Sequence, residues 1–207
     1  MLGKLFLSVL MMTVWLQGAP IHDAVLKGDM KKLETLVTQG ADIEAKDSDG
    51  QTPLMLATLD QNVPMVKYLL AHGAKVNARG AHEQTPLMWA AYFGNKKLIQ
   101  ALLDAGANPN IQDESGYTAL HAAVFGAHHR AVSMILKAGA DVDIQNDQGE
   151  TAMHIAAKVG NVDSVWALIR AGGSNKIKNK EGMTPSEVAY EEDYDRISLI
   201  MQKKAKR

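Results

Sequence analysis

Apolar and polar positions along this chain repeat with period 33. An apolar side chain returns at the same phase in five consecutive periods, at Leu36, Leu69, Leu102, Ile135 and Leu168. A glycine follows each of them at a fixed spacing, at Gly40, Gly73, Gly106, Gly139 and Gly172. A threonine keeps the same step, at Thr52, Thr85, Thr118, Thr151 and Thr184. Three columns with one period indicate a repeat architecture in which each unit packs against its neighbours.

Each period opens with a pattern that predicts a short helix. In the pair Thr52-Pro53, the threonine hydroxyl can accept a hydrogen bond from a free backbone N–H, and proline lacks the N–H that would have no partner. Thr184 and Glu187 have the spacing of a capping box. Alanines follow, so this helix can pack close to its neighbours.

A second apolar helix and a polar loop complete the period. The segment 98–106 is typical of the helix, and its final glycine suits a left-handed position after the helix. The segment 140–150 is typical of the loop, and its turn residues predict a hairpin. Glu83 replaces a glycine that the other loops carry at the turn, so we expect a reshaped turn in the second unit.

Helix, helix and hairpin at this period, opened by T-P-L-x-x-A, resemble the ankyrin repeat family. The resemblance implies an all-α repeat fold, an alpha-solenoid of helix-turn-helix units joined by β-hairpin loops. It runs from about Ala19 to the C-terminus, because one period before Thr52 lies Ala19, in the segment A-P-I-H-D-A at 19–24. We expect a truncated unit at 19–46, repeats at 47–79, 80–112, 113–145 and 146–178, and a C-terminal capping unit at 179–207.

Residues 1–18 differ from the rest of the chain. Lys4 is followed by the apolar run 5–16, which is short for a membrane span and typical of a signal peptide. We predict a signal peptide over 1–18 with cleavage near 18/19, and a periplasmic or secreted protein. Two alternatives stay open: a buried N-terminal helix, and a leader retained as a membrane anchor.

Charge and composition exclude several classes of function. The net charge is −1, so the chain has no general attraction for nucleic acid or for anionic lipid. The basic tail 203–207 is typical of the end of a last helix. The chain has no cysteine, which excludes disulfides, thiolate metal sites and thiol nucleophiles.

The histidines predict structural roles. By the resemblance, His22, His121 and His154 occupy the position after T-P-L, where the imidazole links neighbouring units; Met55 and Met88 replace it in two units, which then rely on packing. No histidine pair has the spacing of a metal site, and no nucleophile elbow, phosphate loop or dinucleotide motif is present. We therefore expect no metal, no cofactor and no enzymatic activity.

The resemblance implies that a protein partner binds to the hairpin tips and to the exposed side of the first helices. Tyr92, Phe93 and Phe125 fall on variable outward positions, and Tyr117 lies on the hairpin between them. We predict an aromatic patch across units two and three; the alternative is that Phe93 and Phe125 stack against neighbouring helices. Trp89 occupies a position expected at the edge of the core. The full set of predicted partner-binding residues is Tyr92, Phe93, Tyr117, Phe125, His82, Asp49, Gln51 and Glu150.

These patterns predict a non-catalytic, exported, monomeric protein–protein interaction module without nucleic acid or small-molecule substrates. The partner's identity is not encoded in the pattern. One rival is a scaffold tethered to the membrane by its leader, and a second is a small-molecule enzyme. An immunity or inhibitor protein directed against a secreted toxin or enzyme is a specialised form of the main interpretation.

Overall fold

The computed structural model describes residues 19–205, which form twelve helices in six pairs. The helices are α2 (Pro20–Leu26), α3 (Met30–Thr38), α4 (Pro53–Leu59), α5 (Val63–Ala71), α6 (Pro86–Tyr92), α7 (Lys96–Asp104), α8 (Ala119–Phe125), α9 (His129–Lys137), α10 (Ala152–Lys158), α11 (Val162–Arg170), α12 (Pro185–Glu191) and α13 (Asp195–Ala205). The predicted leader, residues 1–18, lies outside the described residues. None of the helices within 19–205 combines the length and apolar character that a membrane span requires.

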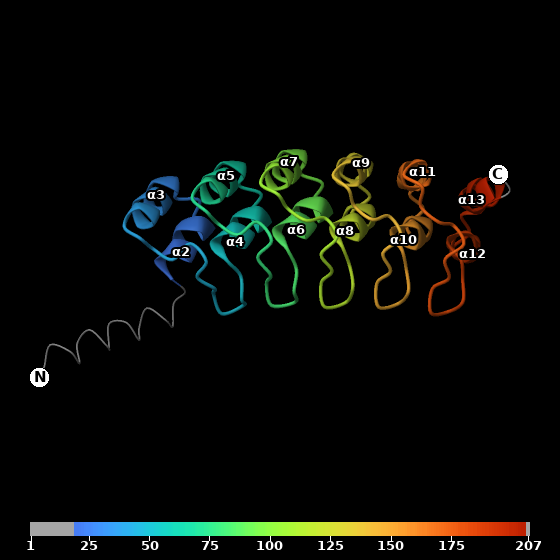
Figure 1. The fold of residues 1–207 in the computed structure, drawn as a ribbon, viewed down its shortest axis with the longest axis horizontal. Coiled ribbons are helices and arrows are strands. Elements are labelled where there is room, and N and C mark those ends of the chain that lie inside the picture. The colour runs from blue at the N-terminus through green and yellow to red at the C-terminus, as the bar shows by residue number, and fades with distance from the viewer. Residues whose placement is uncertain (1–18, 206–207) are drawn as a thin grey trace, which may run out of the picture.

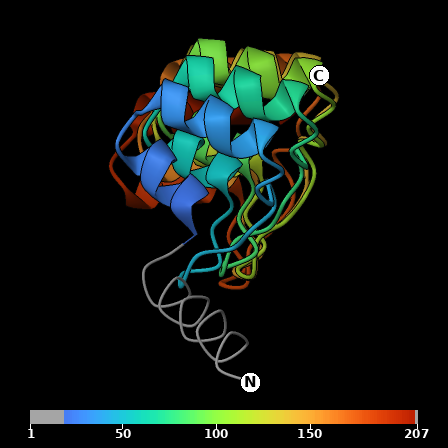
Figure 2. The ribbon, with the colours of Figure 1, turned by 90° about the vertical axis from the view of Figure 1, so that its left-hand side faces the viewer.

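The helix pairs stack in one direction to form an elongated two-layer array. The first helices of the pairs form one row and the second helices form another, with the loops projecting from the side of the first row (Figure 1). Viewed along the stack, the loops of successive units overlie one another (Figure 2). This alpha-solenoid confirms the predicted fold class.

The first helices begin where the threonine column predicts. The N–H of Met55 donates to Thr52 Oγ1 at 3.4 Å, and the same contact recurs at Thr85, Thr118 and Thr184. At Thr184 the capping box is complete, because its own N–H donates to Glu187 Oε2 at 2.7 Å. Asparagines at positions 62, 95 and 161 cap the second helices in the same way.

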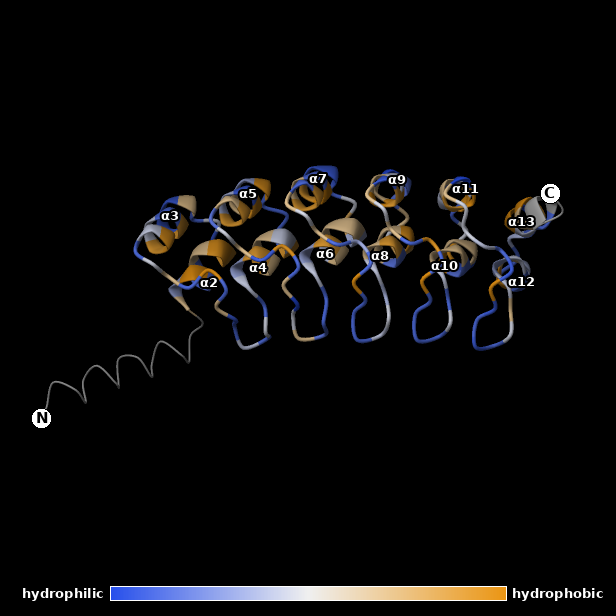
Figure 3. Cartoon of the chain, viewed as in Figure 1, coloured by the Kyte–Doolittle hydropathy of each residue, from blue (hydrophilic) through white to orange (hydrophobic). Residues whose placement is uncertain are grey.

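The core lies between the two rows and continues through all units. Apolar side chains of each unit are buried against the next, and the hairpin tips are hydrophilic (Figure 3). Ala90, Ala123 and Ala156 occupy one position of the repeat and are fully buried on the first helices, which explains why this position carries small residues. In the last unit, Glu191, Glu192 and Asp193 are exposed, as expected of a cap, but Tyr190 and Leu199 are exposed too.

The loops double back as hairpins, although no β-strand is present in residues 19–205. The N–H of Asp47 donates to the carbonyl of Gln51 at 3.0 Å, which closes the first turn. Asp47 Oδ1 also accepts from the N–H groups of Asp49 and Gln51. Aspartate or asparagine holds the turn in this way in every hairpin except the second, where Gly80 occupies the position.

The prediction that Glu83 reshapes its turn is wrong. The N–H of Gly80 donates to the carbonyl of Gln84, and Glu83 adopts φ +60°, within the left-handed region that the glycines of the other turns occupy. A left-handed residue with a Cβ costs about 1–2 kcal/mol. The Glu83 carboxylate pairs with Arg79, and the N–H of Glu114 in the next hairpin donates to the carbonyl of His82 at 3.2 Å, so contacts on both sides of the turn offset part of this cost.

Neighbouring units are also joined by polar ladders that the sequence analysis did not predict. Asn77 Oδ1 accepts from the N–H of Asn108 at 2.9 Å, and Asn110 Oδ1 accepts from the N–H of Asp141 at 2.8 Å. Two residues after Asn110, Gln112 Nε2 donates to the carbonyl of Gln145 at 3.1 Å. These bonds satisfy backbone groups of the next unit, so each interface is specified by polar contacts as well as by packing.

The histidine column links the units as the resemblance implies. Nε2 of His121 lies 3.3 Å from the carbonyl of Glu150, and Nε2 of His154 lies 3.1 Å from that of Met183; both carbonyls belong to the next hairpin. His22 Nε2 lies 2.9 Å from the carbonyl of Ala45, in the loop leading to the next unit. In the second repeat, Met88 Sδ accepts from the N–H of Thr85, as Nδ1 of His121 does from that of Thr118, but the methionine side chain has no N–H with which to link to the next unit.

Candidate protein-binding groove

A groove of about 290 Å³ lies between the second and third repeats, where α6, α8 and the intervening hairpin meet. Four aromatic side chains, Trp89, Tyr92, Tyr117 and Phe125, dominate its lining. The remaining lining residues are Gln84, Met88, Asp113, Thr118 and Ala122. We refer to this site as the aromatic groove.

The short first helices place the rings. Tyr92 is the last residue of α6 and Phe125 is the last residue of α8, so both point away from the core at the same phase of successive units. Their ring centroids lie 6.3 Å apart, with the planes inclined by 24°. Tyr92 is 42% exposed and Phe125 is 59% exposed, so two large apolar side chains face solvent side by side.

Trp89 and Phe93 both contact the exposed ring of Tyr92. Trp89 is half-buried and meets Tyr92 edge-on, at a centroid distance of 6.4 Å. Phe93, which the sequence placed on the outward surface, is half-buried as the C-cap of α6 and stacks on Trp89 at 6.2 Å. Phe93 does not line the groove, because its ring packs against its own helix.

Tyr117 enters the groove from the hairpin side. Asp113 holds this hairpin, since its Oδ1 accepts from the N–H groups of Ser115 at 3.0 Å and Tyr117 at 2.8 Å. Burial raises the pKa of Tyr117, and the negative charge of Glu150 raises it further. The hydroxyl of Tyr117 therefore remains protonated at neutral pH, and the groove keeps its neutral aromatic wall.

The other four predicted binding residues lie outside the groove. Asp49 is exposed at the tip of the first hairpin, and His82 is exposed at the tip of the second, with Nδ1 2.6 Å from Glu114 Oε1. Gln51 is half-buried against Gly80. The prediction that Glu150 contacts a partner is wrong, because Glu150 is buried rather than exposed.

The burial of Glu150 follows from its contacts. Its N–H donates to Asn146 Oδ1 at 2.8 Å, and its Oε2 accepts from Asn146 Nδ2 at 3.1 Å. Lys158 Nζ lies 3.6 Å from the other carboxylate oxygen. Tyr117 occupies the same position one unit earlier, where the side chain lines the groove instead.

Sequence reasoning missed Met88 and Asp113 as members of the lining, whereas Gln84 lies at a hairpin position that the repeat marks as variable. Gln84 and Tyr117 share one column of the repeat, so the column itself was a usable signal. Met88 was predicted to be a packing residue and Asp113 has the position of a turn residue, and both roles are present in addition to their place in the groove.

No group of three or more histidine, aspartate or glutamate side chains within 19–205 is placed to hold a metal ion.

Stacked helix pairs with a constant period, threonine caps and inter-unit histidines define a class of solenoid interaction proteins. The family model described as ankyrin repeats (3 copies) matches residues 21–113, 83–146 and 120–206. The chain therefore belongs to the ankyrin repeat family, whose members are generally protein–protein interaction modules and are typically non-catalytic.

A solved structure of an ankyrin repeat domain from Acinetobacter baumannii AYE is similar to the chain, with a TM-score of 0.84 and 29% sequence identity. The alignment covers 90% of this chain and 97% of that domain. A comparison with curated proteins found no match.

Proposed function

We propose that this protein is a non-catalytic interaction module that binds a protein partner at the aromatic groove and the adjoining hairpin tips. The observation that carries the proposal is the exposed pair Tyr92 and Phe125 beside a groove lined by Trp89 and Tyr117. Aromatic side chains dominate the energetics of protein interfaces when a partner buries them. Exposed contiguous apolar patches on a folded protein mark such interfaces.

Combining Tyr92→Ala with Phe125→Ala should weaken partner binding about 30-fold, the effect of losing a hot spot of about 2 kcal/mol. The free energy of unfolding should change by less than about 1 kcal/mol, because both rings lie at the surface. The partner is first captured from cell fractions and identified by mass spectrometry. Its affinity for the purified wild type and the double variant is then measured by titration calorimetry.

Tyr190→Ala is the matched control for this experiment. Tyr190 is 68% exposed on α12, and it does not line the aromatic groove. Its replacement should leave the affinity unchanged. Equal affinities of the wild type and the Tyr92/Phe125 double variant would place the partner elsewhere and refute the proposal.

We further propose that the protein acts outside the cytoplasm, after removal of residues 1–18. The apolar run 5–16 behind Lys4 supports this proposal, as does the repeat phase, which begins at Ala19.

Mass spectrometry of the protein from its native host should find a mature N-terminus near Ala19 in the periplasmic or secreted fraction. An intact Met1 in the membrane fraction would contradict export and support the tethered scaffold. A change of Leu7 and Leu10 to aspartate should retain the full-length chain in the cytoplasm, because it interrupts the apolar run that an export signal requires.

A further inference from the structure

We propose that the aromatic groove receives a cationic side chain, lysine or arginine, from a basic segment of the partner protein. This inference rests on the proposed function, because it assigns the chemistry of the partner that binds there. It combines the aromatic lining of the groove, the single charged residue within that lining, and the distribution of charge over the molecule.

The rings supply an attractive surface for a cation. The faces of tryptophan, tyrosine and phenylalanine carry partial negative charge, and a lysine or arginine head within about 6 Å of a ring centroid is attracted to them. Trp89, Tyr92, Tyr117 and Phe125 surround one opening, so a single head group can approach more than one ring. The rings alone would also accept an apolar side chain. The charge of the groove favours a cationic side chain over an apolar one.

Asp113 is the one charged residue that lines the groove. Its Oδ1 is used by the hairpin, whereas Oδ2 makes no hydrogen bond to any residue within 19–205. A partner that placed an apolar group over this oxygen would remove it from water without a replacement hydrogen bond, which is unfavourable. A guanidinium or ammonium group instead gives the carboxylate a charged donor.

The hairpins around the groove are acidic, although the net charge of the chain is only −1. The five hairpin turns carry one basic residue, Lys180, and the carboxylates Asp47, Asp49, Glu83, Asp113, Glu114, Asp147, Glu150 and Glu181. Two of them are paired with cations, Glu83 with Arg79 and Glu150 with Lys158, and Glu114 Oε1 lies 2.6 Å from Nδ1 of His82. Asp49, Asp113 and Asp147 form no ion pair with any of the described residues.

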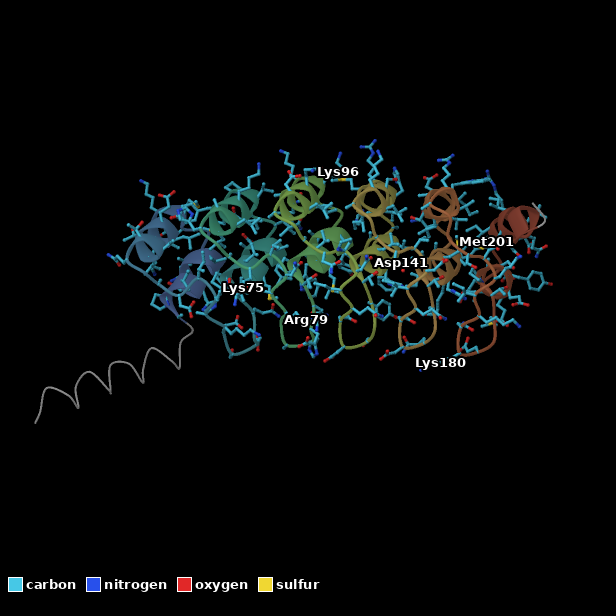
Figure 4. All side chains as sticks on the ribbon, in the orientation of Figure 1. Lys75, Arg79, Lys96, Asp141, Lys180 and Met201 are labelled. Atoms are coloured by element: carbon cyan, nitrogen blue, oxygen red, sulfur yellow. The ribbon has the colours of Figure 1, made fainter. Side chains whose placement is uncertain are left out.

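The second helices, at the opposite edge of the molecule, carry more basic than acidic residues. Figure 4 shows Lys96 on the outer row of helices, whereas Lys180 lies at the end of the last hairpin. The edge formed by the hairpin turns, which borders the groove, is thus more negative than the row of second helices, although Arg79 and Lys180 also lie on that side (Figure 4). A basic segment is attracted to that edge and an acidic one is repelled, which favours both encounter and correct orientation.

Four synthetic peptides test the inference directly. Each repeats Gly-Ser-X three times with blocked ends, and X is arginine, lysine, leucine or glutamate. Titration calorimetry with the purified protein at low salt should show that the arginine peptide binds at least about tenfold more tightly than the leucine peptide. The glutamate peptide should not bind, and added salt should weaken the binding of the arginine peptide. NMR shifts of the Tyr92 and Phe125 rings report whether binding occurs at the groove.

Two variants separate charge from apolar contact. Asp113→Asn keeps the Oδ1 acceptor that the hairpin needs, as Asn146 and Asn179 do in later units, and removes only the charge. This variant should bind the arginine peptide about fivefold more weakly than the wild type does, and its affinity for the leucine peptide should be unchanged. Phe125→Leu keeps an apolar surface without a ring, and its affinity for the arginine peptide should be about threefold lower than that of the wild type.

The outcomes distinguish this inference from the proposed function. Failure of the arginine peptide to bind, or equal affinity of the arginine and leucine peptides, would overturn the cationic assignment. In either case, a loss of natural-partner binding in the Tyr92/Phe125 double variant would leave the groove as the binding site. Undiminished binding of the natural partner by that variant would refute the proposed function itself.

Discussion

Acidification from pH 7 to pH 4 is expected to lower the free energy of unfolding by about 3 kcal/mol through His121 alone. Burial lowers the pKa of His121 from 6.5 to about 4, and burial also lowers the pKa of His154. The hydrogen bonds explain why a proton is excluded. The N–H of Thr118 points at Nδ1 of His121 at 3.1 Å, so protonation of Nδ1 would place two donors face to face.

The direction of the change in stability follows from the number of protons that the folded and unfolded states bind. Between pH 6.5 and 4, the unfolded chain binds a proton at His121 that the folded chain excludes, so the folded state loses stability as the pH falls. The contribution is fully present above pH 6.5 and is lost as the pH falls through 4. His154 shifts in the same direction and adds to the loss.

Urea unfolding at several pH values between 7 and 5 measures the loss of stability that histidine protonation causes. The carboxylates Asp23 and Glu187 do not contribute in this range, because their pKa values are lowered and they titrate below it. The chain provides its own control, since Met55 and Met88 occupy the histidine position in other units. His121→Met combined with His154→Met should flatten the pH profile in this range. A slope unchanged in that variant would show that other groups cause the acid sensitivity.

Gly116→Ala should cost about 3 kcal/mol of stability, the sum of backbone strain and a steric clash. Gly116 has φ +79°, and a Cβ there would lie 2.9 Å from both Asn146 Cα and the backbone N of Asp147. That N–H donates to the carbonyl of Ser115 at 3.0 Å, so the clash would separate two bonded hairpins. Backbone on the far side cannot rotate away as a flexible side chain could.

Gly182→Ala is the matched control for this substitution. Gly182 occupies the same turn position in the last hairpin, with φ +80°, but nothing lies within 4 Å of the added Cβ. It should cost about 1 kcal/mol, the strain alone. Thermal and urea unfolding of the two variants measure the difference, and equal losses would mean that contact between hairpins contributes little to stability.

Much of the fold could be predicted because the determinants are local and recur at fixed spacing. Thr52 caps a helix by bonding to the backbone N–H of Met55 in the first turn, and Gly106 ends one because only glycine adopts φ +84° at low cost. Such interactions depend on neighbours in the sequence. The period then requires that successive units stack, and the outward phase of Tyr92 and Phe125 follows from the same register.

The candidate site could be predicted only in part, because its closure depends on contacts between units. Tyr117 and Glu150 share one column of the repeat, yet Tyr117 lines the groove, whereas Glu150 is buried by Asn146 and Lys158. Phe93 follows Tyr92 directly in the sequence, but it folds back onto Trp89. The local pattern treats each pair alike, and the side chains packed around them separate their roles.

The sequence by itself therefore determined the period, the helix ends, the solenoid class and the candidate aromatic residues, because each rests on short-range chemistry that recurs in every unit. Only the tertiary structure decided which rings share a groove, that Glu83 keeps a left-handed turn, and that Asp113 borders the site. These features depend on which atoms of adjacent units meet, and no single repeat contains that information.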